Sequence, residues 1–156
     1  MRKLIPLLLV LSLFLSGCAH ESANPSYAFD DLSIQFPEAY INLSDEEFAA
    51  DFDFVFGLDP IAVSGLREEK SAFEAYGLDL NLENYGSFII LANNVSAILE
   101  QKDGIYTFSY TSGDFTYLVT IWETKDAFWT VQAYCPTEDY SKAKSDMWSI
   151  LSSVTV

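Results

Sequence analysis

Residues 105–135, IYTFSYTSGDFTYLVTIWETKDAFWTVQAYC, are the stretch of the chain that decides the fold. Apolar and polar residues alternate along it, and the short sequences Ser112-Gly113-Asp114 and Lys125-Asp126 interrupt the alternation. A period of two is typical of strands with one buried face, and strands joined by such short turns are antiparallel neighbours. We therefore predict three paired strands, over 105–111, 115–123 and 128–135.

The residues before this stretch extend the predicted sheet. Residues 87–92 form a continuous apolar run, which indicates a central strand buried on both faces. Asn93-Asn94 is a predicted turn, and residues 95–101 supply a further strand. Together these segments predict a five-stranded antiparallel meander over 87–135.

Two helices are expected before the meander. Ser44 and Glu47 form a capping box, and the apolar residues that follow at helical spacing are Phe48, Phe52, Val55 and Phe56. Gly57 would end this helix. Asp59-Pro60 resembles the start of a second helix that runs towards Tyr76, with Gly77 as its stop.

The two ends of the domain are predicted to be a hairpin and an amphipathic helix. Residues 27–36 read as two short strands around Asp30-Asp31. After the sheet, a helical stripe consists of Tyr140, Ala143, Met147, Ile150, Leu151 and Val154, and residues 152–156 follow as a short extended piece. The expected fold class is α+β: an antiparallel β-meander sheet with helices packed on its faces.

The beginning of the chain has the pattern of a secretory signal. Arg2 and Lys3 precede an apolar run, Leu4 to Leu15, that is about a dozen residues long. An uncleaved anchor helix is the alternative, but it would need roughly 20 apolar residues.

The end of this run, Leu15-Ser16-Gly17-Cys18, resembles the lipobox of bacterial lipoproteins. The resemblance implies that residues 1–17 are a cleaved signal peptide and that Cys18 carries a diacylglyceryl anchor. Residues 18–26 would then be a tether and 27–156 a single globular domain. We expect the protein at the extracytoplasmic face of the cell membrane, with the membrane as a partner through the lipid on Cys18.

The charge of the chain excludes nucleic acid as a partner. Of its 8 basic and 23 acidic residues, residues 1–17 contain two basic and no acidic ones, which leaves 6 against 23 and a net charge of −17. Phosphate binding needs clustered Lys and Arg, and anionic lipid head groups would repel such a surface. The lipid, and not a basic patch, would therefore hold the domain at the membrane.

The order of the predicted elements resembles the PsbP-like fold found in many small bacterial lipoproteins. The resemblance covers most of the mature chain and rests on Phe36-Pro37, Phe128-Trp129-Thr130-Val131 and a terminal helix that runs into Ser153-Val154-Thr155-Val156. Tyr40 departs from it, since a tryptophan is common after the proline, and the helical stretch is long. The resemblance implies a central antiparallel sheet with helices on both faces, an accessory or binding role, and no transferable catalytic residue.

Residues for known catalytic and metal chemistry are scarce. His20 is the sole histidine and lies in the tether, which excludes Ser-His-Asp and Cys-His catalysis and His-rich metal sites. Cys135 lies on the apolar face of its strand and is expected to be a buried thiol. Asp51, Asp53 and Asp59 hint at a calcium loop, but their neighbours do not fit that pattern, and we place Asp51 and Asp53 on the polar side of the first helix. We expect no metal and no cofactor.

Two functions remain open. The first is a non-catalytic binding or accessory module with a protein or small-molecule partner, from which a passive envelope component is hard to separate. The alternative is a carboxylate-dependent hydrolase of the cell envelope, for which two acids suffice, although none of the 23 is distinguished. Aromatic residues of the sheet (Tyr106, Tyr110, Tyr117 and Trp122) line a ligand groove or form cross-strand pairs, and the sequence favours the pairs.

Overall fold

The three strands that alternate most regularly form the centre of the sheet. The computed structural model describes residues 24–156, and in it β7 (Ile105–Ser112), β8 (Phe115–Glu123) and β9 (Ala127–Pro136) are consecutive antiparallel neighbours. Gly113 lies in the turn between β7 and β8 with a φ of 58°, a conformation that glycine adopts without steric cost. The predicted central hairpins are confirmed.

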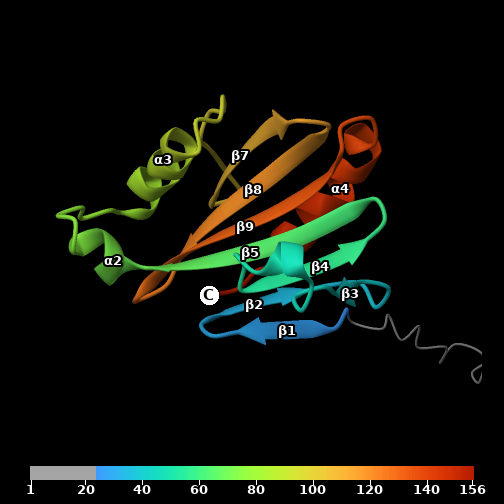
Figure 1. Ribbon diagram of the computed structural model, residues 1–156, viewed down its shortest axis with the longest axis horizontal. Helices are drawn as coiled ribbons and strands as arrows, with labels where there is room; N and C mark the ends of the chain where they lie inside the picture. Colours follow the sequence, from blue (N-terminus) through green and yellow to red (C-terminus); the bar gives the residue numbers. More distant parts are fainter. Residues whose placement is uncertain (1–23) are drawn as a thin grey trace, which may run out of the picture.

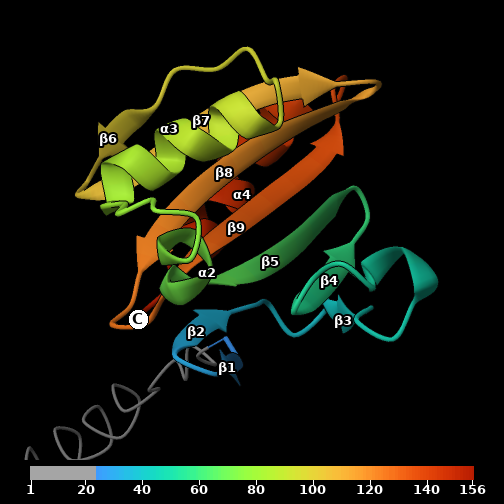
Figure 2. The ribbon, with the colours of Figure 1, turned by 60° about the vertical axis from the view of Figure 1, so that its left-hand side comes forward.

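The main sheet contains seven strands in the order β3-β4-β5-β9-β8-β7-β6 (Figure 1; β6 is labelled in Figure 2). The other four are β3 (Ile41–Asn42), β4 (Phe54–Leu58), β5 (Ile61–Glu69) and β6 (Glu100–Lys102). β5 pairs with β9 from Ala62 opposite Tyr134 to Glu69 opposite Ala127. The first half of the chain therefore completes the sheet along the free edge of β9.

Helices and a hairpin cover the two faces of this sheet. α4 (Tyr140–Leu151) packs on one face, and α2 (Lys70–Glu74) and α3 (Leu82–Ala92) pack on the other (Figure 2). The sheet separates two hydrophobic cores. Consecutive residues of β9 point to different ones, since Trp129 belongs to the core beneath α4 and Phe128 to the core beneath α3. The predicted fold class, an antiparallel sheet with helices packed on its faces, is confirmed.

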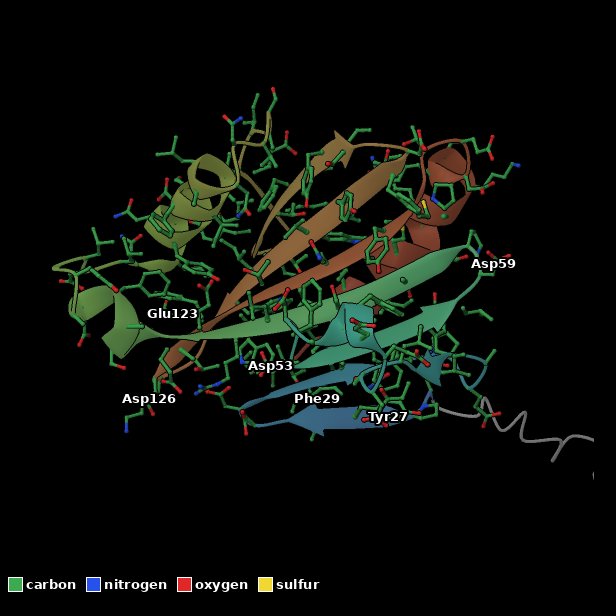
Figure 3. All side chains as sticks on the ribbon, viewed as in Figure 1. Tyr27, Phe29, Asp53, Asp59, Glu123 and Asp126 are labelled. Atoms are coloured by element: carbon green, nitrogen blue, oxygen red, sulfur yellow. The ribbon has the colours of Figure 1, made fainter. Side chains whose placement is uncertain are left out.

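The N-terminal hairpin lies against the α4 side of the sheet. β1 (Ser26–Phe29) and β2 (Leu32–Gln35) pair around Asp30, whose φ is 47°. Tyr27 and Phe29 of β1 reach the aromatic side chains of β4 (Figure 3), and the rings of Phe29 and Phe54 stack with centroids 4.3 Å apart. Both predicted strands are confirmed.

The chain ends beside this hairpin. The buried face of α4 contains Ala143, Met147, Ile150 and Leu151, as the apolar stripe predicts. After α4, Thr155 forms an antiparallel bridge with Ser33 through backbone hydrogen bonds of 2.8 and 2.9 Å. The extended piece predicted over 152–156 is therefore limited to a bridge at Thr155, which joins the last residues to the first strands.

The helix predicted after Ser44 is wrong. The segment contains one short 3-10 helix, Glu47–Ala49, and then becomes β4, in which Phe54, Val55 and Phe56 are all buried. Instead of capping a helix, Ser44 Oγ accepts a hydrogen bond of 3.0 Å from the backbone N–H of Val55. Three consecutive buried aromatic and β-branched residues suit a strand covered on both faces, and this tertiary environment overrides the helical spacing.

The placement of Asp51 and Asp53 on that helix is wrong for the same reason, since neither residue is helical. Asp53 lies directly before β4, where its carboxylate accepts a hydrogen bond of 2.7 Å from the backbone N–H of Arg67. Asp59 lies in the turn between β4 and β5 (Figure 3). Asp53 and Asp59 are thus separated by the length of β4.

The second predicted helix is also mostly wrong. Asp59-Pro60 forms the turn into the nine-residue strand β5, along which Ile61 and Val63 point into the core beneath α4. Only Lys70–Glu74 is helical, and Gly77, with a φ of 75°, follows it as predicted. The pairing of β5 with β4 on one side and β9 on the other outweighs the helix-start signal of Asp-Pro, a sequence that also occurs in turns.

The strand predicted over 87–92 is the C-terminal half of α3. Asn81 caps this helix, with its side-chain oxygen accepting a hydrogen bond of 2.8 Å from the N–H of Asn84. Gly86 lets α3 approach the sheet, since a Cβ there would lie 2.4 Å from Ile121 Cδ1. A short apolar run fits a buried strand or a docked helix equally well. The meander therefore has β6, β7, β8 and β9, with β6 limited to three residues.

Candidate functional site

A depression runs between α4 and the β6–β7 edge of the sheet. Tyr140, Lys144 and Trp148 recur every four residues along α4, so they form one stripe that faces this edge. We call the depression the α4 groove. It has a volume of about 740 Å³ and is lined by Ser96, Ala97, Ile98, Glu100, Lys102, Thr107, Phe108, Ser109, Leu118, Tyr140, Ser141, Lys144, Ser145 and Trp148.

The local structure explains why this stripe stays open to solvent. Met147 and Leu151 are fully buried and fix α4 on the sheet, which leaves Tyr140 and Trp148 at the margin of the same core. On the opposite wall, the turn at Asp103 and Gly104, with φ values of 53° and 83°, returns the chain from β6 to β7. Lys102 is thereby placed at the edge of the sheet, facing α4.

The two lysines of the α4 groove rest on aromatic rings. Lys102 Nζ lies 3.9 Å from the centroid of the Trp148 ring, and Lys144 Nζ lies 5.7 Å from that of Tyr140. Such contacts are favourable by about 0.5–1 kcal/mol at exposed sites. Both ammonium groups therefore keep their hydrogen-bonding capacity while being held over the groove.

A second, smaller cavity lies on the α3 side of the sheet. It has a volume of about 210 Å³, and its polar lining includes Glu68, Thr130 and Gln132. The buried hydroxyl of Tyr85 donates to Glu68 Oε2 at 2.7 Å and lies 2.8 Å from Thr130 Oγ1. Burial raises the pKa of Tyr85, so this hydroxyl stays protonated. The cluster is a satisfied hydrogen-bond network rather than a set of reactive groups.

The aromatic residues of the sheet form cross-strand pairs, as predicted for Tyr110 and Tyr117. These two rings stack with centroids 4.7 Å apart, and Tyr117 stacks on Tyr134 of β9 at 5.1 Å. Burial is the main cause of the raised pKa of both Tyr110 and Tyr134. The row of tyrosines crosses three strands on the α3 face.

Asp31 is held in a strong ionic cluster on the opposite face. Its Oδ1 accepts hydrogen bonds from Arg67 Nε at 3.2 Å and from Trp129 Nε1 at 2.8 Å, and Arg67 also pairs with Glu69. Hydrogen bonding to Arg67 holds the pKa of Asp31 well below its usual range. A carboxyl in this state is unsuited to act as a general acid, which needs a raised pKa.

The acidic residues Asp59, Glu123 and Asp126 do not gather at one place. Asp59 lies at one end of the sheet and Asp126 at the other, where it shares the β8–β9 turn region with Glu123 (Figure 3). Within residues 24–156, no group of three or more His, Cys, Asp or Glu side chains is arranged to hold a metal ion.

The sequence-predicted site residues fall into two groups. Leu15, Ser16, Gly17, Cys18 and His20 lie outside the described residues. Cys135 is fully buried, with its Sγ 3.8 Å from Met147 Sδ, and burial raises the pKa of its thiol. Its expected role as a buried thiol is confirmed.

The arrangement of these elements matches a known architecture. The solution structure of cyanobacterial PsbP (CyanoP) from Synechocystis sp. PCC 6803 superposes with a TM-score of 0.60 and 16% sequence identity, covering 90% of this chain and 96% of that one. The domain has a PsbP-like fold. A crystal structure from Bacteroides thetaiotaomicron VPI-5482 is more distant, with a TM-score of 0.47, 13% identity, and coverage of 86% of this chain and 48% of that one. The sequence matches no model of a known protein family and no curated protein.

Sequence reasoning missed the α4 groove of this PsbP-like domain. Tyr140 was assigned to the buried stripe, whereas Lys144 and Trp148 were not singled out. The four-residue spacing of Tyr140, Lys144 and Trp148 predicts that they share one face of a helix. Lys102 is brought to that face only by the tertiary fold. No local pattern connects β6 with a helix about forty residues further along.

Proposed function

We propose that the protein is a lipid-anchored module on the extracytoplasmic side of the cell membrane that binds a partner and does not catalyse a reaction. The α4 groove carries this proposal, because its volume lies within the range of small-molecule sites and its lining combines rings, hydroxyls and cations. The resemblance of Leu15-Ser16-Gly17-Cys18 to a lipobox supports the location. Within residues 24–156, no helix is long and apolar enough to cross a membrane.

The hydrolase alternative has less support. Asp31, the acid whose environment is most strongly shaped, has a lowered pKa and is engaged by Arg67 and Trp129. Glu68 in the smaller cavity is engaged by the Tyr85 hydroxyl. Paired-carboxylate hydrolysis needs two acids free to flank a scissile bond, and neither residue fits that requirement.

Anchoring is tested at Cys18. The wild-type protein should partition into the membrane fraction and incorporate labelled palmitate, and Cys18→Ser should lose both properties because a serine cannot carry the thioether-linked lipid. Because stable anchoring requires two or more acyl chains, the Cys18→Ser protein, which carries none, should not remain in the membrane fraction even in part. Cys135→Ser is the matched control and should label like wild type. Equal labelling of the Cys18→Ser protein would contradict the anchor.

Binding at the α4 groove is tested by photo-crosslinking in the producing cells. A benzoyl-phenylalanine at Ser145, in the groove, should give a discrete adduct by mass spectrometry. The same residue at Ser149, an exposed position of α4 outside the groove, should give none. Equal adducts at both positions, or none at Ser145, would argue against a binding role for the groove.

A further inference from the structure

The chemistry of the α4 groove differs from that of the remaining surface. Residues 24–156 contain 6 basic and 22 acidic residues, a net charge of −16. Arg67 is paired with Asp31 and Glu69, and Lys70 with Glu123. The other four basic residues, Lys102, Lys125, Lys142 and Lys144, form no ion pair within the described residues, and of these Lys102 and Lys144 line the groove. Two cations thus converge on one depression of a strongly acidic domain, with Glu100 as the sole acid in its lining.

The aromatic rings beneath Lys102 and Lys144 indicate that their ammonium groups are available to bind a ligand. Lys102 covers the face of Trp148, and Lys144 lies near Tyr140, so each ammonium group is retained by a ring and not by a carboxylate. A cation–π contact is weaker than a charge-assisted hydrogen bond to an anion. An arriving anion would therefore draw the ammonium groups towards itself and leave the indole face free.

The rest of the groove suits the uncharged part of such a ligand. Leu118 provides an apolar surface, and the hydroxyls of Ser141 and Ser145 lie on α4 beside Lys144. Ile98 is 79% exposed at the groove, so a bound ring would cover an apolar side chain that is now in water.

We propose that the α4 groove selects an organic anion that carries a flat ring. The anionic group binds between Lys102 and Lys144 with help from the serine hydroxyls, and the ring stacks on Trp148 in the place that Lys102 occupies. This inference rests on the proposed binding role and adds the chemical class of the ligand. Selectivity comes from the acidic remainder of the surface, which repels anions everywhere else.

The test compares two probes that share a ring and differ in charge. Binding of 2-naphthalenesulfonate and of uncharged naphthalene-2-sulfonamide to the full-length protein in nonionic detergent is measured by calorimetry. Wild type should bind the sulfonate at least about tenfold more tightly, and the double substitution Lys102→Gln with Lys144→Gln should remove this preference. Trp148→Leu should weaken both probes, because both lose the stacking surface. Lys142→Gln, on the same helix but outside the groove lining, should behave like wild type.

The outcomes separate this inference from the binding role. Equal binding of the two probes by wild type, with both weakened by Trp148→Leu, would overturn anion selectivity and leave the groove as a binding site. A loss with Lys142→Gln as large as that with the double substitution would also overturn it, since the effect would then be one of general charge. If neither probe binds the folded protein, the inference fails, while the crosslinking at Ser145 still decides the binding role.

Discussion

At the scale of single residues, Asp31 shows how one side chain links distant parts of the domain. It lies in the turn between β1 and β2, yet it accepts hydrogen bonds from Arg67 of β5 and Trp129 of β9. Trp129 is fully buried, and Asp31 satisfies its indole N–H. The carboxylate therefore fixes the N-terminal hairpin to the sheet while supplying the partner that a buried tryptophan needs.

Removing the charge of Asp31 should lower stability in a pH-dependent way. Asp31→Asn keeps the shape but loses the ion pair, and we expect a cost of about 1 kcal/mol at pH 7, because the carboxylate is partly exposed and screened. A lowered folded-state pKa contributes stability above the unfolded pKa, about 3.9, and this contribution is lost as the pH falls below it. Urea unfolding of both proteins between pH 7 and pH 3 measures the difference, which should shrink towards low pH.

The neighbouring aspartate provides the control for this change. Asp30 is exposed in the β1–β2 turn with a φ of 47°, a conformation that asparagine also tolerates. Asp30→Asn should therefore change the free energy of unfolding by less than about 0.5 kcal/mol. Equal losses from both substitutions, or a loss from Asp31→Asn that is independent of pH, would show that the ion pair does not stabilise the hairpin.

At the scale of elements, α4 should behave as part of the core. Met147 has no exposed surface, so Met147→Asp would bury an unpaired charge, and we expect a loss of roughly 4 kcal/mol or more. Ser149→Asp, on the exposed side of the same helix, should cost little. Chemical denaturation of the two variants gives the comparison. Similar shifts of the denaturation midpoint in both would mean that α4 does not pack as described.

The elements also show which parts of the fold a single sequence reveals. β7, β8, β9 and α4 were predictable because alternation or helical spacing persists over several residues and agrees with the turns and caps around it. Residues 44–58 and 87–92 were not, because each offers a strong local signal that tertiary packing overrides. Ser44 bonds to Val55 of a strand, and Gly86 brings the apolar run of α3 against Ile121 as a helix.

The candidate site was less accessible to sequence reasoning than the fold. Cys18 stands out because the four residues that resemble a lipobox are contiguous in the sequence, whereas the α4 groove is built from β6, β7 and α4. The approach of Lys102 to Trp148 depends on the β6–β7 turn and on how α4 docks through Met147. Both are outcomes of packing, so neither leaves a pattern in neighbouring residues.

At the scale of the whole molecule, the acidic surface should make stability depend on salt. With a net charge of −16 over residues 24–156, repulsion between carboxylates opposes the folded state at low ionic strength. Raising sodium chloride from about 0.01 M to about 0.15 M shortens the Debye length from about 30 Å to about 8 Å. We expect a gain of about 1 kcal/mol, or roughly 4 °C in the melting temperature.

Calorimetry at the two salt concentrations measures this effect, and potassium chloride at equal concentration serves as the control for ion identity. A melting temperature that is unchanged or lower in salt would mean that ion pairs such as Lys70 with Glu123 outweigh the general repulsion. Both salts should act equally, because the effect is one of screening.

The bridge between Ser33 and Thr155 has a consequence for the order in which the chain folds during synthesis. The β1–β2 hairpin is synthesised early, but its partners are synthesised late. Trp129, which donates a hydrogen bond to Asp31, is 98 residues from it, and Thr155, which pairs with Ser33, is 122 residues from it. Contacts at such sequence separation form late, because the entropy of closing a long loop is lost before the contacts stabilise the structure. The core beneath α4 thus stays incomplete until translation ends. The export that we propose for this chain would benefit from this delay, because a chain that has not yet folded can still be translocated across a membrane.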